Sequence, residues 1–284
     1  MLLLGACVIG VGPVLVRLSE TGPAAAGLWR LVFALPLLAV MAQKAGGGIG
    51  KAPRAAVFAG VAFALDLGFW HYGIANTSVA KATVLSNLTP VLVTAFAWIF
   101  LKQRPRRLFL LAVAFAVAGA WTMALTKGAG STGVNPSLGD ALSAATAIWY
   151  SLYFLVVSSA RQTMSATRIM FWSTLVGAPL MLIAALVLGE QIMPAGLGGW
   201  AACAGLGLMH VAGQGSIAWA LGRLPAATAS VVVLVQPVVA ALLGWLLFHE
   251  LLGTWPAVGA AIALGGVVLA QWASRPAPPL ETVG

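Results

Sequence analysis

The stretch LDLGFWHYGIANT, residues 65–77, places an acid and an imidazole inside a long apolar run. Asp66 and His71 are its two side chains that can carry charge or exchange protons, and Trp70 offers an aromatic face beside them. A charged side chain at membrane depth costs at least ~2.5 kcal/mol, so it should face protein or a water-filled cavity. The stretch therefore predicts a substrate-binding site that contains Asp66, Trp70 and His71.

The spacing of Asp66 and His71 leaves two interpretations open. Five residues separate them by about 140° around a helix, so they do not share one face. On the first interpretation, one of them lines a cavity while the other orients a neighbouring helix. On the second, each is a buried polar residue that is hydrogen-bonded to another helix.

Further ligand contacts are predicted from two other apolar segments. Trp149 and Tyr153 are four residues apart on one helix face, so their rings could enclose an apolar side chain or an ammonium group. Gln214 is a candidate from a segment that also carries His210, which serves equally well as a hydrogen bonder between helices. The alternative for the rings is core packing, or for Tyr150 an anchor at the membrane interface.

Two prolines inside apolar runs predict interrupted helices, and polar side chains precede both: Asn87 and Thr89 before Pro90, and Gln236 before Pro237. A helical proline frees the carbonyl group four residues back, so Ser86 and Val233 are expected to expose backbone oxygens. Amides and free carbonyls together suit a zwitterion. The alternative is that these side chains only satisfy the two breaks.

Arg30 also falls within an apolar segment. It could steer a carboxylate or lock a gate at the outer end. Alternatively, it could extend to the surface or pair with Glu20.

The composition requires a membrane around these residues. Of the 284 residues, 61% are hydrophobic and 7% charged, against about 25% charged in soluble domains. The net charge of +9 does not predict a nucleic-acid partner, because the basic residues fall mostly in short loops. Cys7 and Cys203 lie in apolar runs and are interpreted as small buried side chains, with no disulfide, metal or cofactor expected.

About 20 apolar residues are needed to cross a bilayer. Ten segments are predicted to do so: 2–19, 24–42, 55–75, 79–101, 107–126, 138–158, 167–188, 197–221, 226–248 and 255–273. Most of the 15 Lys and Arg residues fall on one side of these spans, which predicts that both termini are cytoplasmic. The tail 276–284 is Pro-rich and expected to be disordered.

The chain also repeats its own spacing. Paired positions share Trp and Pro: Trp29 and Pro36 with Trp172 and Pro179 at an offset of 143, and Pro90 and Trp98 with Pro237 and Trp245 at 147. Each half, 1–130 and 131–275, holds five predicted spans, and an odd number makes the second half enter from the opposite side. The expected fold is therefore an all-α integral membrane protein whose two inverted five-helix repeats surround a central cavity.

Four stretches carry a resemblance to a known family: GLWRLVFALPLLAV, SVAKATVLSNLTPVLVTAFAWIFL, TASVVVLVQPVVAALLGWLLFHELLGTW and VGAAIALGGVVLA. They resemble the EamA-type drug/metabolite transporter superfamily, and the aromatic-rich centre is most similar to YddG-like bacterial exporters of aromatic and neutral amino acids. The acid common after the ninth span is present as Glu250, whereas the first half has Lys102-Gln103 at that place. The resemblance implies a ten-helix basket in the bacterial inner membrane that works by alternating access.

The function predicted is export of small amphipathic metabolites, aromatic and neutral amino acids foremost, by a protein that acts as a monomer. No phosphate-binding loop is present, so ATP does not drive transport directly; proton coupling and flow down a gradient both remain open. An alternative is proton-coupled efflux of drugs or other metabolites, for which Asp66 is the one acid deep in a span. An intramembrane enzyme is disfavoured, because no nucleophile with a base and no metal cluster appears at span depth.

Overall fold

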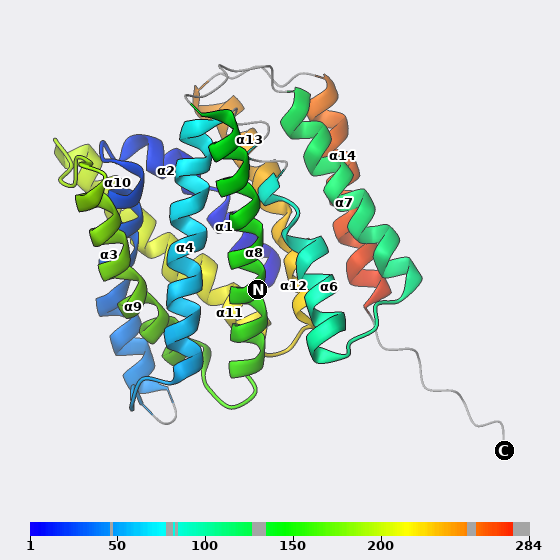
Figure 1. The fold of residues 1–284 in the computed structure, drawn as a ribbon, viewed down its shortest axis with the longest axis horizontal. Coiled ribbons are helices and arrows are strands. Elements are labelled where there is room, and N and C mark those ends of the chain that lie inside the picture. The colour runs from blue at the N-terminus through cyan, green and yellow to red at the C-terminus, as the bar shows by residue number, and fades with distance from the viewer. Residues whose placement is uncertain (46–47, 78–81, 83–84, 127–134, 249–253, 275–284) are drawn as a thin grey trace.

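The computed structural model describes all residues except 46–47, 78–81, 83–84, 127–134, 249–253 and 275–284, and those described form helices and connecting turns (Figure 1). Five helices are long and apolar enough to cross a membrane: Pro23–Lys44, Arg54–Gly73, Pro136–Ala160, Ala166–Val187 and Ala226–Leu247. Shorter apolar helices accompany them. The expected all-α class is therefore confirmed, whereas the predicted tail 276–284 and Glu250 lie outside the described residues.

The helices follow the predicted apolar segments in order. The first part of the chain forms α1 (Leu2–Ile9), α2 (Gly12–Leu18), α3 (Pro23–Lys44), α4 (Arg54–Asn76), α6 (Thr89–Leu101) and α7 (Arg107–Thr126). The second forms α8 (Pro136–Ala160), α9 (Ala166–Val187), α10 (Leu197–Met209), the π-helical turn η1 (His210–Gln214), α11 (Gly215–Ala220), α12 (Ala226–Val233), α13 (Val235–Phe248) and α14 (Thr254–Ala273).

Helix boundaries fall just before both prolines that the sequence singled out. Pro90 lies in the first turn of α6, and Pro237 lies in the first turn of α13, after the break at Leu234. The expectation that the Ser86 carbonyl is free is wrong, because Thr89 Oγ1 donates a hydrogen bond to it at 2.8 Å. Proline has no N–H group to donate to this carbonyl oxygen, and the hydroxyl group of the residue before the proline donates to it instead.

Helices α7 and α14 lie side by side at the right of Figure 1. Small residues bring their backbones together: a Cβ atom on Gly119 would lie 2.3 Å from the Ala263 nitrogen, and one on Gly266 would lie 2.4 Å from the Ala116 nitrogen. Neither position has room for a side chain. Close backbone approach through small residues is how helices gain packing energy where lipid removes the hydrophobic drive.

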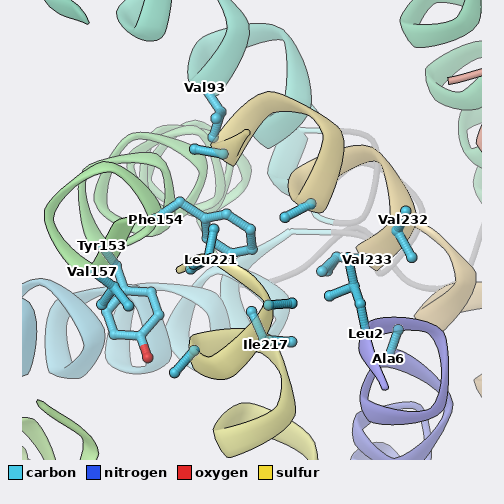
Figure 2. Packing of buried hydrophobic residues seen from close by; sticks show 14 of the residues in the cluster. Leu2, Ala6, Val93, Tyr153, Phe154, Val157, Ile217, Leu221, Val232 and Val233 are labelled. Atoms are coloured by element: carbon cyan, nitrogen blue, oxygen red, sulfur yellow. The ribbon is translucent and has the colours of Figure 1, made fainter. Parts of the chain in front are cut away.

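The core joins the beginning of the chain to its second half. Figure 2 shows Tyr153 and Phe154 of α8 beside Ile217 of α11 and Leu221, the residue that follows this helix. In the same view, α1 lies against α12, where Leu2, Ala6, Val232 and Val233 meet.

Two tryptophans tie α3 and α9 to loops in the other half of the chain. Trp29 Nε1 donates to the Ile192 carbonyl at 2.8 Å, and Trp172 Nε1 donates to the Ile49 carbonyl at 3.1 Å. Adding 143 to 29 gives 172, and adding 143 to 49 gives 192, so donor and acceptor repeat at one offset. Each half therefore makes the same hydrogen bond to the other.

Glu190 caps the N-terminus of α3. Its carboxylate accepts hydrogen bonds from the backbone nitrogens of Ala24 and Ala25, at 3.2 and 2.9 Å, and from the Tyr72 hydroxyl. A Cβ atom on Gly22 would clash with this side chain. An acid at a helix N-terminus satisfies free N–H groups and the positive end of the helix dipole.

Glu190→Gln is expected to lower stability by about 2 kcal/mol, because the amide keeps the shape but loses the charge and one acceptor. Thermal unfolding of the purified protein, followed by size-exclusion chromatography, measures the shift. Glu20→Gln is the matched control, since Glu20 accepts only from the Gly196 nitrogen at 3.0 Å. Equal melting temperatures for Glu190→Gln and the unaltered protein would refute the assignment.

Candidate functional site

Three helical segments meet at a hydrogen-bonded chain inside the bundle. Arg30 of α3 donates from Nε to His210 Nδ1 at 3.3 Å, and His210 Nε2 lies 3.0 Å from Thr174 Oγ1 of α9. Because arginine can only donate, Nδ1 must accept, and the neutral ring then donates from Nε2 to the threonine. His210 therefore forms hydrogen bonds between helices, which was one of the two interpretations of this residue. It also holds the guanidinium group of Arg30 in place.

The partner of Arg30 differs from one expectation. Pairing with Glu20 is wrong, because Glu20 accepts from the Gly196 nitrogen while Arg30 turns toward His210. Arg30 is half-buried rather than extended to the surface. Sequence reasoning could not find this contact, since the two residues lie 180 positions apart.

The π-helical turn η1 presents both His210 and Gln214 to the interior. Such turns insert one residue into a helix and occur frequently at functional sites. Gln214 is 1% exposed and lies beside the hydroxyl groups of Tyr150 and Tyr153. Its amide nitrogen nevertheless has no hydrogen-bond partner among the residues described. A buried donor without a partner is uncommon in proteins and suits a position where a ligand or water binds.

Phe63 of α4 is the aromatic centre of this region. The Arg30 guanidinium carbon lies 5.3 Å from its ring centroid, and the rings of His210 and Tyr153 each lie 5.3 Å away. Tyr150 stacks on Tyr153 at 6.0 Å with an interplanar angle of 10°. The sequence analysis missed Phe63, because a phenylalanine in an apolar run carries no distinguishing signal except its spacing of three residues from Asp66.

Asp66 lies one helical turn beyond Phe63 and is half-buried. It is near enough to Arg30, Tyr150 and Tyr153 to act on them electrostatically, without a direct ion pair to the arginine. Both groups of the opening motif, Asp66 and His71, therefore lie within electrostatic reach of Arg30.

His71 is 7% exposed, and both of its ring nitrogens are buried without a hydrogen-bond partner in the part of the chain that the structure describes. The ring centroid of Trp70 lies 5.0 Å away. Among the described residues, His71 therefore makes no hydrogen bond to another helix. The imidazole keeps its full capacity to bind a ligand or an ordered water molecule.

Polar side chains at the two helix breaks divide into satisfied and unsatisfied groups. The amide nitrogens of Asn87 and Gln236 are buried, and neither has a hydrogen-bond partner within the described segments. Thr89, in contrast, is 6% exposed and has its hydroxyl occupied by Ser86. Only the two amides thus leave donors available at the breaks.

The aromatic candidates on α8 also differ from one another. Trp149 is half-buried, whereas Tyr153 is 1% exposed and has its hydroxyl 3.7 Å from the Met170 sulfur. Tyr153 is therefore the more deeply buried of the two rings. Tyr150, for which an interfacial anchor was the alternative, lies instead in the interior against Tyr153 and Gln214.

Comparison with known proteins agrees with a transport fold. The model of the EamA-like transporter family matches residues 1–125 and 137–272. An uncharacterised transporter of Archaeoglobus fulgidus is 25% identical over 223 residues, which is 78% of each chain. A crystal structure that is 16% identical superimposes with a TM-score of 0.82 over 96% of each chain, a likeness that shows the fold alone. The chain belongs to the EamA-like transporter family.

Proposed function

We propose that the protein exports small amphipathic metabolites, aromatic and neutral amino acids foremost, across the bacterial inner membrane by alternating access. The observation that carries this proposal is a set of buried side-chain nitrogens that have no hydrogen-bond partner among the described residues: those of His71, Asn87, Gln214 and Gln236, beside Arg168 Nε at the start of α9. Polar groups left unsatisfied inside a membrane protein cost free energy, and a polar ligand would recover it. Family membership supports transport as the purpose of that ligand site.

The architecture proposed is two inverted five-helix repeats, 1–130 and 131–275, with ten membrane spans and both termini cytoplasmic. The reciprocal hydrogen bonds of Trp29 and Trp172 support it, because a two-fold pseudosymmetry would exchange them. The helix boundaries before Pro90 and Pro237 support it as well. In transporters built this way, substrate sites lie at the repeat interface, and one half rocks against the other.

Within this architecture, the substrate would be held in a central cavity between the halves. Polar contacts would come from Asp66, His71, Asn87, Thr89, Gln214 and Gln236. Trp70, Trp149 and Tyr153 would form the aromatic wall. The combination selects molecules with both polar groups and an apolar side chain, which describes the aromatic and neutral amino acids. A monomer encloses such a site without help from a second copy.

A second candidate, proton-coupled efflux of cationic drugs, has one observation in its favour. Asp66 is a half-buried acid that makes no direct ion pair with the residues the structure describes, as a carboxylate that exchanges protons for cations requires. Resistance of cells to quaternary cations that disappears in Asp66→Asn would favour this candidate over amino-acid export.

The test is uptake of labelled amino acids into liposomes that contain the purified protein, with and without an imposed pH gradient. Saturable uptake of phenylalanine, leucine or a related amino acid is expected, and a rate that rises with the gradient would add proton coupling. Lack of uptake for every amino acid, with protein that remains monodisperse, would contradict the proposed substrate class.

A further inference from the structure

Arg30 and Asp66 can carry opposite charges, and the fold holds them near enough to interact electrostatically without a direct ion pair between these two described residues. Arg30 is anchored through Nε, which donates to His210 Nδ1. Its terminal nitrogens make no hydrogen bond to the described residues, and they are not among the buried atoms without partners. The Asp66 carboxylate oxygens likewise make no hydrogen bond to the described residues, and both side chains are half-buried.

Helix packing directs the two groups toward the same space. The guanidinium lies 5.3 Å from the Phe63 ring centroid. Asp66 follows Phe63 by three residues on the same helix face, a rise of about 4.5 Å. Gly27, one turn before Arg30, leaves α3 close to α4, because a Cβ atom there would lie 2.9 Å from Leu67 Cδ2. The two side chains therefore lie on helices in close contact, near enough to interact electrostatically.

An ionised side chain without a partner is expensive in the interior of a membrane protein. A ligand with one negative and one positive group could satisfy both charges at once. The two terminal nitrogens of an anchored arginine match the two oxygens of a carboxylate. A carboxylate in the protein can accept the hydrogen bonds of an ammonium group. An α-amino acid carries these groups on a single carbon.

We propose that Arg30 binds the carboxylate and Asp66 binds the ammonium group of one zwitterionic amino acid, with its side chain against Tyr150 and Trp149. This inference rests on the proposed function, and it identifies the two residues that decide which charged groups a substrate must carry. His210 is a positioning residue, because it holds Nε and leaves the terminal nitrogens toward the ligand.

The test compares three ligands of one shape: phenylalanine, phenethylamine, which lacks the carboxylate, and hydrocinnamate, which lacks the ammonium group. Binding to the detergent-purified full chain is measured by isothermal titration calorimetry. In Arg30→Gln, phenylalanine and hydrocinnamate should weaken about 10- to 100-fold while phenethylamine stays unchanged. In Asp66→Asn, phenylalanine and phenethylamine should weaken by a similar factor while hydrocinnamate does not.

Matched controls are Arg54→Gln, at an exposed arginine, and Asp140→Asn, at an acid that already accepts from Thr77 at 2.7 Å. Neither should change the preference among the ligands. If Arg30→Gln does not yield monodisperse protein, Arg30→Lys keeps the charge but not the fork, and should still weaken phenylalanine relative to phenethylamine. If each variant weakened the binding of all three ligands by the same factor, this inference alone would be overturned. Failure of the unaltered protein to bind phenylalanine or any neutral amino acid would overturn the proposed function with it.

Discussion

Gly266→Leu is expected to prevent α7 and α14 from packing together and to leave little monodisperse protein after detergent extraction. A Cβ atom at Gly266 would lie 2.4 Å from the Ala116 nitrogen and 2.7 Å from its Cα atom. The obstructing atoms belong to the backbone, so no change of rotamer relieves the clash and the helices must separate. The cost should reach about 3 kcal/mol or more, at the upper end for overpacked sites.

The neighbouring glycine supplies the control for this prediction. A Cβ atom at Gly265 would meet nothing within 4 Å, so Gly265→Leu should give normal protein, with a small gain in helix propensity. Both variants and the unaltered chain are expressed separately under the same conditions. Fluorescence-detected size-exclusion chromatography then compares their yields and elution profiles. Equal yields and elution profiles for the two leucine variants would contradict the packing described for α7 and α14.

Trp149→Ala is expected to weaken binding of aromatic amino acids about 10-fold, with a smaller effect on alanine or serine. The indole is half-buried on α8, next in sequence to Tyr150, whose ring lies in the interior. Aromatic pairs contribute about 0.5–1.5 kcal/mol beyond the area that they bury, and loss of that area adds to the effect. Competition against labelled phenylalanine in proteoliposomes measures both classes of substrate in one experiment.

A tryptophan on the outside of the bundle controls for the general effect of removing an indole. Trp98 of α6 is 51% exposed, and Trp98→Ala should leave the affinity for phenylalanine unchanged. If Trp149→Ala weakens alanine as much as phenylalanine, the indole supports the fold rather than contacting the substrate side chain. Unchanged affinity for every substrate would remove Trp149 from the site.

Features that depend on local spacing could be predicted from the sequence. The helix boundaries before Pro90 and Pro237 follow from proline geometry, and the all-α class follows from the length and apolarity of the segments. The paired spacing of Trp29 and Trp172 was visible, because it needs only identical residues at a constant offset. The sequence did not reveal the physical basis of this spacing, which is a hydrogen bond from each indole to a loop carbonyl in the other half of the chain.

Contacts between distant segments could not be predicted, because apolar helices leave their neighbours unspecified. Nothing in the sequence indicates that Arg30 turns toward His210 instead of Glu20, or that Phe63 lies beneath the guanidinium. The π-helical turn at 210–214 also has no compositional signal, since one inserted residue leaves the apolar pattern intact. These three features together place the charged groups of the candidate site.

The polar residues at the two helix breaks also show which features could be predicted from local sequence and which could not. Proline geometry predicted correctly that backbone oxygens lose their usual partner, yet Thr89 supplies a replacement for Ser86. Asn87 and Gln236 have no such local acceptor for their amide nitrogens. Whether a side chain satisfies a break or points to a ligand depends on rotamers and on the neighbouring helix, which a single sequence does not contain.

Counterflow in proteoliposomes tests most directly whether one site is opened to each side of the membrane in turn. Vesicles are loaded with unlabelled phenylalanine and diluted into a trace of labelled phenylalanine, with no other gradient. The account predicts transient accumulation of label above its equilibrium level, abolished in Arg30→Gln, because each return of the carrier requires an occupied site. Label that enters equally fast without internal phenylalanine, or does not enter at all, would contradict it.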